Sequence, residues 1–168
     1  MSAEQVKKQA AYLEWGPYKF KSGSLAGGRK YFSNYLMTIT PPHGLCAVTG
    51  TATEIVDPYG KQLQEQFREL SSILSAKYGT PTALIDQVNP NLAWSEPRNW
   101  TFSLSRGERV LKASWNQALP DSLASITLEV RNLGHSYTAD RGYLQLQYEF
   151  DNIGDCKAWP NAKEASQL

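Results

Sequence analysis

The sequence predicts an α+β fold, a single twisted antiparallel sheet of about seven strands with one long amphipathic helix packed on one face. One segment, about residues 58–78, has the apolar period and the end signals of a long helix. The segments before and after it alternate apolar and polar side chains, which is typical of antiparallel strands that bury one face. The order of these segments along the chain is βββ-α-ββββ.

The predicted helix has clear signals at both ends. Asp57 is a suitable N-cap, and Pro58 suits the first helical turn. Gly79 favours the end of the helix, and Pro81 prevents its continuation. An apolar stripe at helical spacing lies between these signals, and its members are Leu63, Phe67, Leu70 and Leu74, with Ile73 and Tyr78 beside them. We expect this stripe to pack on the sheet, because an amphipathic helix needs a partner surface.

The strands are predicted from alternation with a period of two residues. Three precede the helix, in residues 17–22, 29–40 and 44–56. Four follow it, and they are expected in residues 100–105, 111–115, 126–130 and 144–150. Residues 80–98, between the helix and the next strand, contain three prolines and no clear period. We expect an irregular surface segment there, in which Leu84 and Ile85 allow a short strand.

The length of 168 residues favours one globular domain over residues 1–168. Residues 1–14 are expected to be a frayed or short helical segment, and residues 157–168 a flexible tail. No apolar run reaches the roughly 18 residues of a membrane-spanning helix, so we predict no membrane insertion. The later half has the general character of small bacterial or phage proteins, without a motif that carries a function.

The two cysteines, Cys46 and Cys156, leave two alternatives open. They are either buried free thiols or a disulfide that closes a loop of about 110 residues. The polar N-terminal segment lacks the apolar core of a signal peptide, which favours a cytoplasmic location. A periplasmic or secreted location follows instead if a signal peptide has been removed and the two cysteines are joined.

Charge gives one candidate site near the N-terminus. The net charge of the chain is +1, so the whole molecule offers no strong field for nucleic acid. Four cations interleave with aromatic residues in the first hairpin, and they are Lys19, Lys21, Arg29 and Lys30. Cations with aromatic rings suit single-stranded nucleic acid, which is our first alternative function. The alternation also permits a simpler arrangement, with the aromatic rings in the core and the lysines in water.

The sequence contains no clear catalytic, cofactor or metal motif. His43 and Cys46 are three positions apart on an extended segment, so they point to opposite sides and do not suit a catalytic dyad or a metal site. We therefore expect no cofactor and no metal, and we favour a protein that is not an enzyme. Three glutamates on predicted strands, Glu54, Glu129 and Glu149, keep a small hydrolase as the second alternative, because such chemistry needs two carboxylates at a defined separation.

The first hypothesis is a non-catalytic protein-binding module of the inhibitor, immunity or adaptor type. Trp94 and Trp159 lie in irregular segments with polar neighbours, and an exposed Trp in a loop is typical of a binding hot spot. Glu96 and Arg98 accompany Trp94, so we expect an aromatic loop on a rigid scaffold to be the contact site. The partner is expected to be another protein, and the sequence does not predict which one or the oligomeric state.

Overall fold

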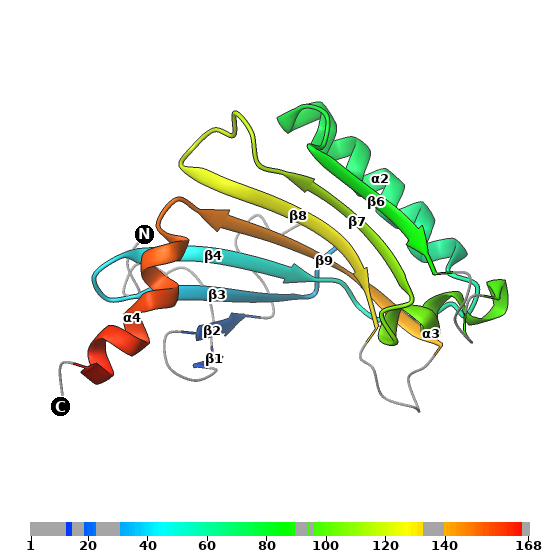
Figure 1. The fold of residues 1–168 in the computed structure, drawn as a ribbon, viewed down its shortest axis with the longest axis horizontal. Coiled ribbons are helices and arrows are strands. Elements are labelled where there is room, and N and C mark those ends of the chain that lie inside the picture. Colours follow the sequence, from blue (N-terminus) through cyan, green and yellow to red (C-terminus); the bar gives the residue numbers. More distant parts are fainter. Residues whose placement is uncertain are drawn as a thin grey trace.

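The computed structural model describes residues 13–14, 19–22, 31–89, 94, 96–132 and 140–165. These residues form one antiparallel sheet, with a long helix on one face and further helices near its ends (Figure 1). Seven strands have four or more residues, and they are β2 (Lys19–Ser22), β3 (Asn34–Thr40), β4 (Gly44–Thr51), β6 (Ala83–Val88), β7 (Arg109–Trp115), β8 (Leu123–Arg131) and β9 (Arg141–Phe150). Two further strands have only two residues, and they are β1 (Leu13–Glu14) and β5 (Ile55–Val56). The predicted α+β class is confirmed.

The strands follow the order β1-β2-β3-β4-β9-β8-β7-β6 across the sheet, and β5 also pairs with β9. The chain therefore makes two antiparallel meanders, and its last strand, β9, joins them at the centre. Tyr148 of β9 lies opposite Val48 of β4 on one side and opposite Ile126 of β8 on the other. Strand β6 lies at one edge of the sheet as a consequence.

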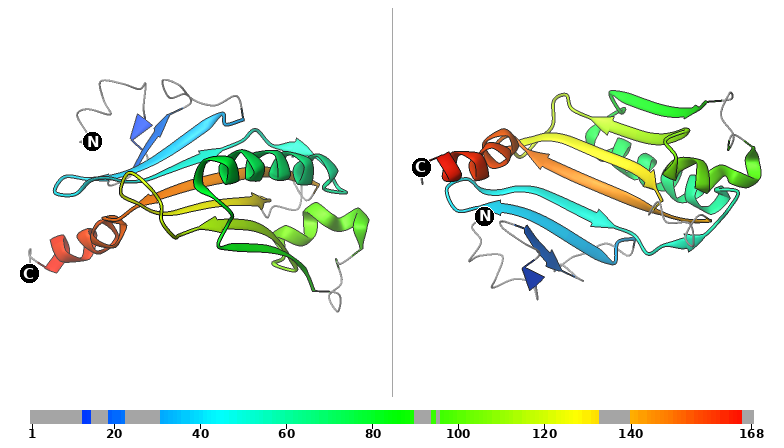
Figure 2. Two further views of the ribbon diagram at one scale, coloured as in Figure 1. Left: turned by 90° about the horizontal axis from the view of Figure 1, so that it is seen from above. Right: turned by 60° about the horizontal axis from the view of Figure 1, so that its bottom comes forward.

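Helix α2 (Lys61–Tyr78) lies across one face of the sheet and connects the two meanders (Figure 2). Its four buried side chains are the ones predicted from the sequence, and they are Leu63, Phe67, Leu70 and Leu74. They share one core with apolar side chains of the sheet, among them Trp115, Ile126, Leu128 and Leu144. Ile73, expected beside the stripe, is instead 49% exposed. The helix side of the sheet therefore holds the main core.

Helix α2 begins three residues later than predicted. A turn precedes it, in which the N–H of Gly60 donates to the carbonyl of Asp57 at 2.9 Å. Asp57 still caps the helix from this turn, because its carboxylate accepts the N–H of Leu63 at 3.0 Å. The C-terminal end follows the prediction, since Gly79 has a positive φ of 83° and donates its N–H to the carbonyl of Ser75.

Two elements after α2 differ from the prediction. Residues 100–105, predicted as a strand, form helix α3 (Trp100–Ser105), which follows the 3-10 turn η1 (Pro97–Asn99). The alternation of apolar and small polar residues over six positions also fits a short helix, and here it buries Thr101 and Ser103 as well as Trp100. The seventh strand is instead β6, which lies in the segment predicted to be mainly irregular and includes Leu84 and Ile85, where a short strand was allowed.

The C-terminal segment also differs from the prediction. Helix α4 (Ile153–Ala165) occupies most of the stretch expected to be a tail. Cys156 of α4 forms a disulfide with Cys46 of β4, with the two Cα atoms 6.4 Å apart, so the structure has the second of the two cysteine alternatives. Cys46 is the extra residue of a β-bulge where the pairing of β3 with β4 shifts.

Residues 1–12 lie outside the described residues, and so does most of the predicted frayed or helical N-terminal segment. Only Leu13 and Glu14 of that segment are described, and they form strand β1. None of the helices in the described part of the chain is both long enough and apolar enough to span a bilayer.

Candidate functional site

The face of the sheet opposite α2 is polar. Alternate positions of β7, β8 and β9 bury apolar side chains under the helix, so the positions between them lie on the other face. The side chains on this face include Lys112, Ser114, Thr127, Glu129, Gln145, Gln147 and Glu149. We call this surface the open face.

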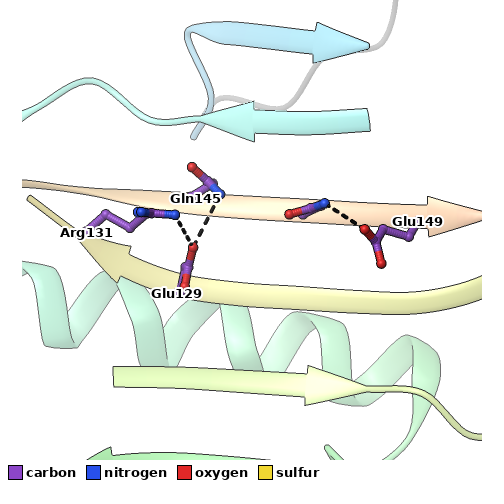
Figure 3. Close-up of polar contacts among 5 residues, drawn as sticks. Glu129, Arg131, Gln145 and Glu149 are labelled. Atoms are coloured by element: carbon purple, nitrogen blue, oxygen red, sulfur yellow. Dashed lines mark hydrogen bonds and ion pairs between the residues drawn. The ribbon is translucent and has the colours of Figure 1, made fainter. Parts of the chain in front are cut away.

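Glu129 and Glu149 lie on the open face but do not form a pair (Figure 3). Gln145 lies opposite Glu129, and Glu149 is four residues further along β9, which places the two glutamate backbones about 13 Å apart. Glu129 accepts from Arg131 at 2.9 Å, whereas Glu149 is paired with Lys157 at 3.0 Å. Paired carboxylates of glycosidases lie only about 5–9.5 Å apart, so this arrangement does not favour the hydrolase alternative.

Glu54 lies in the loop after β4 and not on a strand. Its charge acts on Tyr143 of β9, whose pKa is raised mainly because the phenol is partly buried. The positive charge of Arg131 opposes this rise in the pKa, while Glu129 and Glu54 add to it. These groups form a polar cluster at one end of the open face, in which the phenol stays protonated at neutral pH.

A pocket of about 260 Å³ lies beside this cluster, where β7 and β8 separate. The pairing of these strands ends at Lys112 and Glu129, although β7 stays paired with β6 as far as Arg109. Arg109 and Arg131 both line the pocket. Arg131 is paired with Glu129, and the guanidinium of Arg109 lies over the ring of Trp100 at 5.2 Å. These contacts favour a structural role for both arginines.

Within the described residues, no group of three or more His, Cys, Asp or Glu side chains is placed to hold a metal ion. The four cations of the nucleic-acid alternative lie only partly in the described region. Lys19 and Lys21 of β2 are paired in register with Thr38 and Leu36 of β3. Arg29 and Lys30 are outside the described residues.

Trp94, Glu96 and Arg98 lie close to helix α3 in the sequence and surround its start. The ring of Trp94 contacts Phe102 edge-on, with the centroids 4.6 Å apart, and Trp94 remains 38% exposed. Its backbone N–H donates to the carboxylate of Glu108 at 2.9 Å, and Glu108 is buried. Glu96 and Arg98 form an exposed ion pair at 2.8 Å. The structure therefore holds Trp94 at two points, its ring against Phe102 and its backbone N–H on the buried carboxylate of Glu108.

Trp159, the fourth predicted contact residue, belongs to helix α4, at the opposite end of the sheet from α3 (Figure 1). Its ring contacts His43 edge-on, with the centroids 6.1 Å apart. Its indole nitrogen is buried without a hydrogen-bond partner among the described residues. The four predicted contact residues thus form two separate groups, and Trp159 does not extend the surface around Trp94.

Strand β6 is a candidate surface that the sequence indicated only as a short strand at Leu84 and Ile85, without its place at the edge of the sheet. It is the last strand in the sheet order, and among the described residues it pairs only with β7. Its pairing is unbroken over six residues, and Leu84 and Val88 are 62% and 39% exposed. A regular edge strand without proline or bulge can pair with a further strand. Pro81 and Pro90 on either side of it made the segment look irregular.

The end of strand β6 and Trp94 both contact Glu108. The N–H of Asn89, just after the strand, donates to the carbonyl of Glu108 at 2.8 Å, and the carboxylate of the same Glu108 accepts the N–H of Trp94. The end of the strand and the backbone of Trp94 are therefore anchored to one residue. We call the surface formed by Leu84, Asp86, Val88 and Trp94 the β6–Trp94 edge.

Comparison of the chain with protein-family models, with curated proteins and with solved structures finds no match.

Proposed function

We propose that this protein is a non-catalytic protein-binding module, of the inhibitor, immunity or adaptor type, that contacts its partner through the β6–Trp94 edge. The observation that carries the proposal is the exposed indole of Trp94, fixed by Phe102 and by the buried Glu108. An aromatic side chain that is already ordered loses little conformational entropy on binding. Trp is also among the residue types most enriched in binding hot spots.

The neighbours of Trp94 support a contact role. Glu96 and Arg98 are both largely exposed, and an exposed ion pair contributes only about 0–1 kcal/mol to folding. Such a pair suits the polar rim of an interface, where charges guide association more than they stabilise the fold. Leu84 and Val88 extend the apolar part of the surface along the edge strand. Exposed apolar side chains next to a polar rim are typical of protein contact sites.

The disulfide favours one cellular compartment for this binding activity. A bond between Cys46 and Cys156 persists in an oxidising compartment, so we propose that the module acts in the periplasm or outside the cell and not in the cytoplasm. The mass of the protein isolated from its host and alkylated without reduction tests this. We expect no alkylated cysteine, and two alkylated cysteines would contradict the proposed compartment.

A photo-crosslinking side chain at position 94 tests the proposed contact. In the native host we expect one discrete crosslinked species from position 94 and none from position 73, where Ile73 is similarly exposed on helix α2. Trp94→Ala should remove partner binding in a protein that stays folded, and lower the free energy of unfolding by about 1–3 kcal/mol through loss of the Phe102 contact and of the area that Trp94 buries. Equal crosslinking at both positions, or unfolding of Trp94→Ala, would show that Trp94 is not the contact residue.

A further inference from the structure

We infer that the β6–Trp94 edge binds an extended segment of the partner protein as an added β-strand, and that this segment carries an apolar–x–basic–x–apolar pattern. The inference rests on the proposed function and specifies the mode of binding. Three observations support it. They are the direction of the backbone groups of β6, the side chains on the helix side of that strand, and the poor fit of a second copy of the chain.

The backbone of β6 presents hydrogen-bonding groups outward. The N–H of Asn89 points toward β7, because it donates to the carbonyl of Glu108. N–H groups alternate in direction along a strand, so those of Leu84, Asp86 and Val88 point away from β7. In the described part of the chain no strand pairs with that side. Donors and acceptors at every second residue match an extended backbone, as in other complexes formed by strand addition.

The side chains on the helix side specify the added strand. Leu84 lies opposite Ala113 and Asp86 opposite Leu111, so both residues lie on the same side of the sheet as α2, and Val88 follows at the next such position. Residues of an added strand that lie directly opposite share this side. Two apolar residues would therefore meet Leu84 and Val88, and a basic residue would meet Asp86.

Asp86 has no ion-pair partner within the part of the chain that the structure describes. Burial lowers the pKa of Arg109 of β7, and the charge of Asp86 opposes this shift, so the two groups interact electrostatically without forming an ion pair. The guanidinium of Arg109 is held elsewhere, over the ring of Trp100 and with its Nε donating to Ser103 at 3.2 Å. The exposed carboxylate of Asp86 is thus open to a cation from a partner.

A second copy of this chain fits the edge poorly. Two β6 strands that pair antiparallel with their helices on the same side can be centred on Asp86, and then the two carboxylates lie directly opposite each other. A register shifted to either side places Asp86 opposite Leu84 or Val88 of the other copy. Like charges directly opposite are destabilising, whereas a charged pair of opposite sign is favourable. The carboxylate therefore selects a different chain with a basic residue.

A charge exchange tests the inference. Two fluorescein-labelled nine-residue peptides of alternating Val and Thr differ only at the centre, which is Lys in one and Glu in the other. We expect the protein to bind the Lys peptide about fivefold more tightly, as one favourable and one unfavourable cross-strand pair imply. Asp86→Lys should reverse this preference and Asp86→Asn should abolish it. Thermal unfolding confirms that each variant is folded.

A pair of proline variants tests the backbone part of the inference. Val88→Pro removes an outward N–H and leaves the hydrogen bonds to β7 in place. The variant should therefore fold, and its affinity for both peptides should be at least tenfold lower. Gln87→Pro is the matched control, because the N–H of Gln87 points toward β7 and its loss should lower thermal stability.

Three results would overturn the inference. They are no binding of either peptide at about 1 mM, a preference that Asp86→Lys leaves unchanged, and a dimer of the wild-type protein in sedimentation that Val88→Pro disrupts. If position 94 still crosslinks a partner, strand addition is wrong but the protein-binding function stands. If position 94 crosslinks nothing, the proposed function fails together with the inference.

Discussion

The indole Nε1 of Trp115 donates a hydrogen bond to the carbonyl of Gly79 at 2.8 Å. This contact joins the end of β7 to the residue at which helix α2 ends, and Trp115 is only 1% exposed. The same indole belongs to the apolar core beneath the helix. The position of α2 on the sheet is therefore fixed by one directional bond as well as by apolar packing.

Trp115→Phe should lower the free energy of unfolding by about 1–3 kcal/mol. The substitution removes the donor to Gly79 and leaves unfilled volume in the core. Urea denaturation measures the change. Trp94→Phe is the matched control, because the indole of Trp94 is partly exposed and a phenyl ring can keep the contact with Phe102. An equal effect of both variants would contradict this role for Trp115.

Gly60 should tolerate no side chain. Its φ is 69°, and a Cβ atom there would lie 2.0 Å from the ring of Trp100. Gly107 has the same φ of 69° with nothing within 4 Å of such an atom. We expect Gly107→Ala to cost about 1–2 kcal/mol from the left-handed backbone alone. Gly60→Ala should cost more or prevent folding, and similar melting temperatures for the two variants would show that Trp100 can move aside.

Loss of the disulfide should destabilise the fold. The bond between Cys46 and Cys156 spans 110 positions of the chain, and the chain-entropy model gives about 4–5 kcal/mol for a loop of this length. Denaturation of the Cys46→Ala/Cys156→Ala variant measures the loss, and the reduced wild-type protein should match it. A variant as stable as the oxidised protein would mean that the bond contributes little to the fold.

Tyr143 should make stability fall in alkali. Burial raises the pKa of its phenol in the folded protein, so the unfolded chain loses this proton first as the pH rises. The contribution of Tyr143 is complete below the ordinary pKa of tyrosine, about 10, and declines above it. Thermal unfolding of the wild-type protein and of Tyr143→Phe between about pH 8 and 11 tests the sign. The difference in stability between them should change only above about pH 10.

The sequence predicted the elements that local signals determine. Helix α2 was predicted with its four core residues because they lie within one continuous amphipathic segment and because Gly79 and Pro81 end it. Residues 100–105 were assigned wrongly, since a six-residue alternation has no unique period. Their helix depends on tertiary burial of residues such as Thr101, whose N–H donates to the carbonyl of Pro58, a residue that precedes α2 in the sequence.

The candidate site depends on strand order, which local patterns do not encode. Trp94 is exposed, as its polar neighbours in the sequence predicted. Strand β6, in contrast, lies at the edge of the sheet because β9, and not β6, pairs with β4. The same pairing brings Glu149 opposite Ala47, and so carries Cys156 toward Cys46. Neither the edge nor the disulfide could be decided from the residues around them.

The central place of β9 has a consequence for synthesis of the chain. Residues 141–150 pair with a strand of each meander, β4 and β8, and among the described strands they are the last to leave the ribosome. Until then β4 and β8 are both open edges. Only part of the sheet face on which the apolar stripe of α2 packs has been synthesised. We therefore expect a nascent chain of this protein to expose two incomplete half-sheets, whose open edges favour pairing with other chains until β9 is added.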